Sequence, residues 1–115
     1  MNPLFSIITV TFNAENEISP TLASVKEQSF GNFEHLIIDG ASKDNTIRIA
    51  EQAAISQMSI VSEPDKGLYD AMNKGIGLAK GDFLIFLNAG DSFADSDSLK
   101  RLAELATDDT DIIYG

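Results

Sequence analysis

The sequence predicts an α/β domain with a mostly parallel sheet. Segments typical of strands and of helices alternate along the 115 residues, the connections are short, and the strand-like segments are almost continuously apolar. Such alternation is typical of parallel strands joined by right-handed helical crossovers. Strands without polar alternation are covered on both faces. Because the length is near the usual domain size, we expect a single domain over residues 1–115.

The first half of the chain alternates two strands with two helices. Residues 4–12 and 33–38 are rich in β-branched, aromatic and aliphatic side chains, as buried strands are. Between them, apolar residues recur at helical spacing: Ile18, Leu22 and Val25. We expect the second helix to begin at Thr46, with Asp44 or Asn45 as its cap.

The second half continues the pattern. A short strand is expected over residues 59–62, and the apolar run 83–87 predicts another. The helix between them has an apolar stripe: Leu68, Met72, Ile76 and Ala79. Asp95 or Asp97 is expected to cap a fourth helix, and 111–114 to form the last strand. Since the chain ends one residue later, either the fold closes there or the chain is cut from a longer protein.

Composition excludes several classes of site. The chain has no cysteine, which excludes disulfides, thiolate zinc sites and thiol catalysis. A single histidine, His35, excludes a multi-histidine metal centre. The net charge of −10 disfavours nucleic acids and anionic membranes as partners and favours cations. No apolar run approaches the roughly 20 residues of a membrane span, and the start is not basic, so we expect a cytoplasmic chain.

Three of the expected strands end in polar residues: at Asn13, at Asp39 and at the segment 88–91. One such ending is typical of a turn. In open α/β sheets, however, ligands bind beyond the carboxyl ends of the strands. Three polar endings at that edge therefore predict a cleft for a polar ligand.

The expected ligand is a diphosphate held with a divalent metal. No phosphate-binding loop of the Walker or dinucleotide type follows the first strand, which disfavours those enzymes. Carboxylates at Asp39 and Asp91 would repel a bare diphosphate. Mg²⁺ or Mn²⁺ removes the conflict, because these ions bind carboxylates and substrate phosphates together. Gly90, next to Asp91, would leave room for the phosphates.

Three stretches carry a resemblance to a known family. They are SIITVTFNAENEISPTLASVKEQSF, HLIIDGASKDNT and DKGLYDAMNKGIGLAKGDFLIFLNAGD. In order and spacing they resemble the N-terminal half of family 2 glycosyltransferases of the GT-A fold. The resemblance implies a Rossmann-like domain that binds a UDP- or GDP-linked sugar with Mg²⁺ or Mn²⁺. It further implies transfer of the sugar to a glycan or lipid-linked acceptor in polysaccharide or cell-surface glycan synthesis.

The resemblance also implies site residues. Thr11, Phe12, Asn13 and Glu15 would line the nucleobase pocket, and Asp39 would accept a hydrogen bond from the base. The remaining donor contacts would come from Asp70, Asn73, Asn88, Ala89 and Gly90, with Asp91 as the metal ligand. Three positions depart from the family pattern. Thr11 stands in place of a proline at the start of the nucleobase pocket. Met72 stands where many relatives have arginine, and Gly90 where a ribose-contacting acid is common.

The resemblance names no catalytic base, because in the family the base follows the segment present in this chain. We therefore expect donor binding without transfer by this chain alone, with the acceptor-binding half missing. Inversion at the sugar carbon is what the family implies. Association with the inner face of the membrane through the missing part, and self-association through an unpaired last strand, are two further expectations.

Two alternatives stay open. The first is a nucleotide-binding module without catalytic activity, which the departures at Met72 and Gly90 favour. The second is a Mg²⁺-dependent phospho-acceptor signalling domain. That class would have an acidic pair after the first strand and a lysine after the fifth, whereas here the first strand ends at Phe12 and Asn13.

Overall fold

The computed structural model describes residues 2–106 and 112–114, the latter as backbone. In this part of the chain five strands form one sheet in the order β3-β2-β1-β4-β5. The strands are β1 (Phe5–Thr11), β2 (Phe33–Asp39), β3 (Met58–Ser62), β4 (Phe83–Phe86) and β5 (Ile112–Tyr114). All four neighbouring pairs are parallel, which confirms the predicted sheet. Asp111, expected in the last strand, lies outside the described residues.

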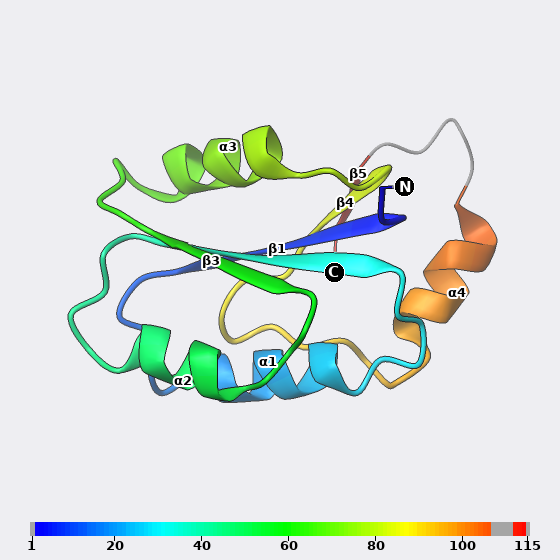
Figure 1. The fold of residues 1–115 in the computed structure, drawn as a ribbon, viewed down its shortest axis with the longest axis horizontal. Coiled ribbons are helices and arrows are strands. Elements are labelled where there is room, and N and C mark those ends of the chain that lie inside the picture. The colour runs from blue at the N-terminus through cyan, green and yellow to red at the C-terminus, as the bar shows by residue number, and fades with distance from the viewer. Residues whose placement is uncertain (1, 107–111, 115) are drawn as a thin grey trace.

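Helices cover both faces of the sheet. They are α1 (Ile18–Lys26), α2 (Thr46–Gln52), α3 (Leu68–Leu78) and α4 (Ser98–Leu105). Figure 1 shows α1 and α2 below the sheet and α3 above it, with α4 at one end. Strand and helix therefore alternate as predicted. In the part of the chain that the structure describes, no helix is long and apolar enough to cross a membrane.

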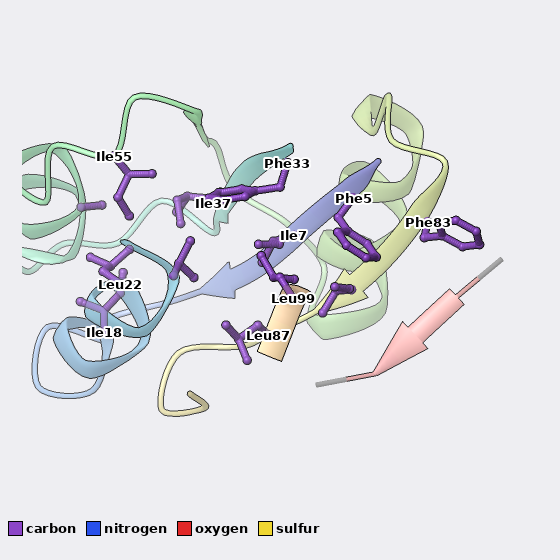
Figure 2. Close-up of a cluster of buried hydrophobic side chains, with 13 residues drawn as sticks. Phe5, Ile7, Ile18, Leu22, Phe33, Ile37, Ile55, Phe83, Leu87 and Leu99 are labelled. Carbon is purple, nitrogen blue, oxygen red and sulfur yellow. The ribbon is translucent and has the colours of Figure 1, made fainter. Parts of the chain in front are cut away.

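The larger core lies between the sheet and helices α1 and α2 (Figure 2). Alternate residues of β1 point into it, among them Phe5 and Ile7, while Ile8 faces α3. Leu87 is fully buried in this core although β4 ends at Phe86, one residue earlier than expected. The aromatic ring of Phe5 packs against that of Phe83 at a centroid distance of 6.2 Å.

The smaller core, on the α3 side, corrects one prediction. The expected apolar stripe of α3 included Leu68 and Ile76, but these side chains are 52% and 43% exposed. The buried residues of α3 are Ala71 and Gly75. A β-carbon on Gly75 would lie 2.6 Å from Cγ2 of Ile8, so α3 approaches the sheet through its small residues.

The helix starts also differ in part from expectation. Asp44 accepts hydrogen bonds from the amide and the hydroxyl of Thr46 at the start of α2, as predicted for a cap. Of the two residues expected to cap α4, Asp97, at the N-cap position, makes no capping hydrogen bond, whereas the carboxylate of Asp95 accepts a hydrogen bond from the Asp97 amide at 2.9 Å. Oε1 of Gln28 accepts a hydrogen bond from the amide of Leu99 at 3.0 Å.

Candidate functional site

The polar strand endings meet at one edge of the sheet. Strand β1 lies between β2 and β4, and all three run in the same direction, so their carboxyl ends are neighbours. The loops after β1, β2 and β3 gather at the left of Figure 1. The chain reverses its strand order at the β1–β4 boundary, and such boundaries in α/β sheets open crevices for ligands.

The loops after β1 and β2 are held together by hydrogen bonds. The donors and acceptors are Asn13 N to Ser42 Oγ (2.8 Å), Ala14 N to Thr46 Oγ1 (2.8 Å), Lys43 N to Asn13 Oδ1 (2.9 Å), Glu15 N to Asp44 Oδ2 (3.2 Å) and Asn45 N to Glu15 Oε2 (2.9 Å). Asn13 has φ of 48°, a left-handed conformation that asparagine tolerates. The two loops thus form one rigid wall of the site.

Asp39, at the end of β2, is 1% exposed, and both of its oxygens accept hydrogen bonds. Its partners are the Thr11 hydroxyl (2.6 Å), the Ser42 hydroxyl (2.5 Å), the Ser42 amide (2.8 Å) and the Ser62 hydroxyl (2.8 Å). Burial raises the pKa of Asp39, but the hydrogen bonds from Ser42, Thr11 and Ser62 outweigh it, so the pKa lies below its ordinary value. The carboxylate is therefore an anion that ties β1, β2 and β3 together.

A pocket of about 450 Å³ opens beside this wall. Thr11 and Phe12, both predicted for the nucleobase site, line it. Val10, Gly40, Asp65, Gly67 and Leu68 complete the lining. Phe12 is 64% exposed, so its ring offers a free flat face at the mouth of the pocket. An aromatic face of this kind can stack on a nucleobase.

Asn13 and Glu15 do not line this pocket. Their side-chain oxygens accept hydrogen bonds from loop amides, as described above, and Glu15 borders a separate hollow of about 410 Å³ with Asn45 and Arg48. In this structure both residues hold loop shape.

Asp70 and Asn73 lie on α3 and are not among the residues that line the pocket. The Asp70 carboxylate accepts a hydrogen bond from the Lys66 amide at 2.9 Å and lies 3.8 Å from Nζ of Lys74. Nζ of Lys74 also pairs with Glu63 at 3.3 Å. Asp70 thus closes the loop that precedes α3, while the side chain of Asn73 is exposed.

The segment after β4 brings Asn88, Ala89, Gly90 and Asp91 to the same edge. Oδ1 of Asn88 accepts a hydrogen bond from the Val10 amide at 3.3 Å, which joins this segment to β1. The amide of Asp91 donates to the Asn88 carbonyl at 2.9 Å, forming a turn. Gly90 has φ of 98°, which glycine adopts without strain. Space alone does not require glycine, since an added β-carbon would meet only Cβ of Glu17, at 3.9 Å.

The donor set at Asp91 fits a divalent ion bound together with a substrate. Asp91 is exposed, and its carboxylate makes no hydrogen bond or ion pair within the described residues. The described residues hold no cluster of three or more metal-ligating His, Cys, Asp or Glu side chains. Mg²⁺ and Mn²⁺ need no such cluster, because one or two carboxylates, water and substrate phosphates suffice. Asp91 would hold the ion.

Sequence reasoning missed Asp65, Gly67 and Leu68 as pocket residues. The spacing of Leu68 predicts a position in the buried stripe of α3, whereas its side chain is exposed and lines the pocket. The signal that could have found them is position, since all three follow β3 at the carboxyl edge of the sheet. Thr21 was missed as well: its hydroxyl on α1 accepts a hydrogen bond from the Gly90 amide at 3.0 Å.

Comparison with known proteins supports the resemblance found in the sequence. The chain is 39% identical over 118 aligned residues to a PGL/p-HBAD biosynthesis glycosyltransferase of Mycobacterium tuberculosis (strain H37Ra). The match covers 98% of this chain and 46% of the relative. The chain therefore spans less than half of that relative's length.

Solved structures share the fold. Residues 1–349 of Staphylococcus aureus TarS, solved with UDP-GlcNAc, superpose with a TM-score of 0.82 at 28% identity, over 90% of this chain and 30% of TarS. A mannosyltransferase of Pyrobaculum calidifontis, solved with GDP-Man and Mn²⁺, superposes with a TM-score of 0.82 at 23% identity, over 93% of this chain and 33% of that protein. These neighbours are GT-A glycosyltransferases, which confirms the predicted fold class.

The family itself follows from a match along almost the whole chain. The model described as "Glycosyl transferase family 2" matches residues 6–115, which include every strand ending that builds the site. The chain belongs to glycosyl transferase family 2.

Proposed function

We propose that this chain is the donor-binding part of a glycosyltransferase. It binds a nucleoside-diphosphate sugar at the carboxyl edge of β1, β2 and β4, with a divalent metal at Asp91. The family match and the likeness to TarS, which was solved with UDP-GlcNAc, support this proposal. The protein transfers the sugar to a glycan or lipid-linked acceptor in polysaccharide or cell-surface glycan synthesis.

The state of Asp91 is the observation that carries the proposal. Of the four acids predicted for the site, Glu15, Asp39 and Asp70 each accept hydrogen bonds from the chain itself. Asp91 alone among them has an exposed carboxylate with no partner within the described residues. A free anion at the crevice would repel a diphosphate unless a cation lies between the two. A divalent metal is the cation that binds both.

The apolar pocket at Phe12 accounts for the nucleoside. Its walls, from Thr11 and Phe12 on one side to Leu68 on the other, suit a flat base, and Asp65 adds a carboxylate acceptor for a base N–H group. Asp39, although saturated by protein donors, fixes the wall on which the base would lie. A direct contact from Asp39 to the base, and contacts from Asn13, Glu15 and Asn73 to the donor, stay predictions.

The role of the metal in sugar transfer follows from the charge of the leaving group. Negative charge develops on the departing diphosphate as the bond to the sugar breaks, and a bound metal ion would neutralise it. The base that deprotonates the acceptor hydroxyl is expected from the part of the protein that follows this segment in the family. Within the described residues, Glu15, Asp39 and Asp70 accept hydrogen bonds from the chain itself. Inversion at the sugar carbon, a cytoplasmic location at the membrane's inner face and self-association also stay predictions.

The family match leaves the phospho-acceptor hypothesis without support. Nucleotide binding without catalysis remains the second candidate, and the departure at Gly90 favours it because one carboxylate stands where relatives often have more. A transfer assay with the whole protein separates the two candidates. Transfer by residues 1–115 alone would contradict our expectation that this chain binds the donor without transferring the sugar.

An NMR titration tests donor binding and places it. Amide resonances of the folded protein are followed while UDP or GDP is added with Mg²⁺. We expect shifts at Phe12, Gly40 and Gly67 around the pocket, and at Gly90 and Asp91. The matched control is the nucleoside without phosphates, which should shift the pocket amides only. If neither nucleotide shifts these amides, the proposal is wrong.

A further inference from the structure

A polar stripe on α1 faces the segment that carries Asp91. The stripe consists of Thr21 and Ser24, at positions i and i+3 on one side of the helix, and it is continued by Gln28, which follows the end of α1 at Lys26. The apolar side of the same helix is buried in the core through Ile18, Leu22 and Val25. Thr21 is itself completely buried although it is polar, so its hydroxyl needs a partner inside the protein.

Each member of the α1 polar stripe binds the chain between β4 and α4. Oγ1 of Thr21 accepts a hydrogen bond from the Gly90 amide at 3.0 Å. Oγ of Ser24 accepts one from the Phe93 amide at 3.2 Å and donates to the Thr21 carbonyl at 2.8 Å. Nε2 of Gln28 donates to the Asp95 carbonyl at 2.7 Å, and Oε1 accepts from the Leu99 amide at 3.0 Å. Helix α1 and Gln28, just beyond its end, thus bind the segment at three points and the first turn of α4 at a fourth.

Asp91 lies between the first two of these points. Its own amide is bound to the Asn88 carbonyl, and its neighbours at positions 90 and 93 are bound to α1. Its carboxylate, in contrast, is free within the described residues. The backbone at Asp91 is therefore fixed while its side chain stays available. Such an arrangement pre-organises a metal ligand, because the backbone loses its conformational entropy when the protein folds and not when the metal binds.

We propose that Thr21 and Ser24 are positioning residues for the metal–diphosphate site, which they set through the amides of Gly90 and Phe93. This inference rests on the proposed function, since it assumes that Asp91 binds the metal. Thr21 is completely buried and would act through the backbone and not on the ligand itself. Each hydroxyl accepts a hydrogen bond from an amide close to Asp91, and the Gly90 amide that donates to Thr21 belongs to a residue with φ of 98°.

Two substitutions at position 21 separate positioning from stability. Thr21→Val keeps the side-chain volume and removes the hydroxyl, so the packing around α1 is preserved while the Gly90 amide loses its partner. Thr21→Ser keeps the hydroxyl and removes a buried methyl group, so stability falls while the Gly90 bond remains. We expect Thr21→Val to weaken Mn²⁺-dependent binding of UDP or GDP by about threefold to tenfold, the worth of one hydrogen bond. Thr21→Ser should bind as the unaltered protein does.

Controls are available within the chain. Thr9→Val also removes a fully buried threonine hydroxyl, but Thr9 bonds to His35 in the core and not to the Asp91 segment. It should leave nucleotide binding unchanged. Ser24→Ala is a second test that avoids a fully buried position, and it should weaken Mn²⁺-dependent binding while leaving the binding of uridine or guanosine unchanged. If Thr21→Val does not fold, Ser24→Ala alone tests the positioning role.

Calorimetry measures the binding of UDP and of GDP to each variant with and without Mn²⁺. The inference is supported if Thr21→Val or Ser24→Ala weakens binding and Thr21→Ser and Thr9→Val do not. It is overturned if Asp91→Asn abolishes the Mn²⁺ effect while Thr21→Val and Ser24→Ala bind as the unaltered protein. If the unaltered protein shows no Mn²⁺-dependent binding at all, the proposed function fails, and the positioning role fails with it.

Discussion

Nε2 of His35, in the middle of β2, lies 2.7 Å from the hydroxyl oxygen of Thr9 on the neighbouring strand β1. Both residues are completely buried, and Nδ1 of His35 has no partner within the described residues. An orphaned buried N–H is more costly than an orphaned acceptor. We therefore predict that the proton sits on Nε2 and is donated to Thr9, leaving Nδ1 as a bare lone pair. The ¹⁵N chemical shifts of the ring would show this tautomer, and Nδ1 protonation would contradict it.

The same burial predicts sensitivity to acid. Desolvation lowers the pKa of His35 from 6.5 to about 4, so the folded protein keeps the ring neutral where the unfolded chain binds a proton. Stability from this group is therefore complete above pH 6.5 and is lost as the pH falls towards 4. The loss at the lower end should be about 3 kcal/mol in the free energy of unfolding.

His35→Leu isolates this contribution because it removes the titrating group. Urea unfolding at a pH of about 7 and of about 4 should show a fall that is about 3 kcal/mol larger in the unaltered protein than in the variant. Equal falls in the two proteins would show that His35 stays neutral in the unfolded chain or is charged in the fold. Because both proteins have the same acidic groups, the contribution of those groups to the pH dependence of the unfolding free energy cancels in the comparison.

Two glycines of α3 should respond oppositely to alanine. A β-carbon at Gly75 would lie 2.6 Å from Cγ2 of Ile8, whereas one at Gly77 would have no heavy atom within 4 Å. Gly75→Ala should therefore lower the free energy of unfolding by about 1–3 kcal/mol through overpacking. Gly77→Ala should raise it by about 0.5–1 kcal/mol, because alanine favours the helix. Thermal unfolding of both variants measures this, and a similar change in both would contradict the close approach of α3 to β1.

The residue that follows the C-cap of α2 predicts a stabilising change. Ala54 has φ of 56°, a left-handed conformation that costs an L-residue about 1 kcal/mol. Ala54→Gly should therefore raise the free energy of unfolding by about 1 kcal/mol. The neighbour Ala53, with φ of −66°, is the matched control, and Ala53→Gly should be destabilising. Urea denaturation decides; destabilisation by Ala54→Gly would contradict the backbone conformation described.

The sheet and the site's location could be predicted from sequence because both depend on order along the chain. Alternating apolar strands dictate a parallel sheet, and a parallel sheet brings Asn13, Asp39 and Asp91 to one edge wherever their side chains point. The buried face of a helix is harder to predict. On α3 the large residues Leu68 and Ile76 dominated the pattern, but the sheet contacts small residues, since close approach favours Ala71 and Gly75.

The detailed roles of polar residues could not be predicted, because they depend on contacts distant in sequence. Asp97 looked like a helix cap, yet Gln28, 71 residues before Leu99, caps α4. Asp39 looked like a free acceptor, yet donors from three strand ends occupy it. The hydroxyl of Thr21 gave no signal at all, since a threonine in an amphipathic helix is unremarkable until the Gly90 amide is found beside it.

Asp91 is proposed to bind the metal ion that holds the donor diphosphate. The most direct measurement is calorimetry of UDP and GDP binding, with and without Mn²⁺, for the unaltered protein, Asp91→Asn and Asp82→Asn. Asp82 is the matched control, because it is also exposed but precedes β4, at the opposite edge of the sheet. We predict that Mn²⁺ strengthens binding of one nucleotide by at least about tenfold in the unaltered protein and in Asp82→Asn, and not in Asp91→Asn. An undiminished Mn²⁺ effect in Asp91→Asn would contradict the account.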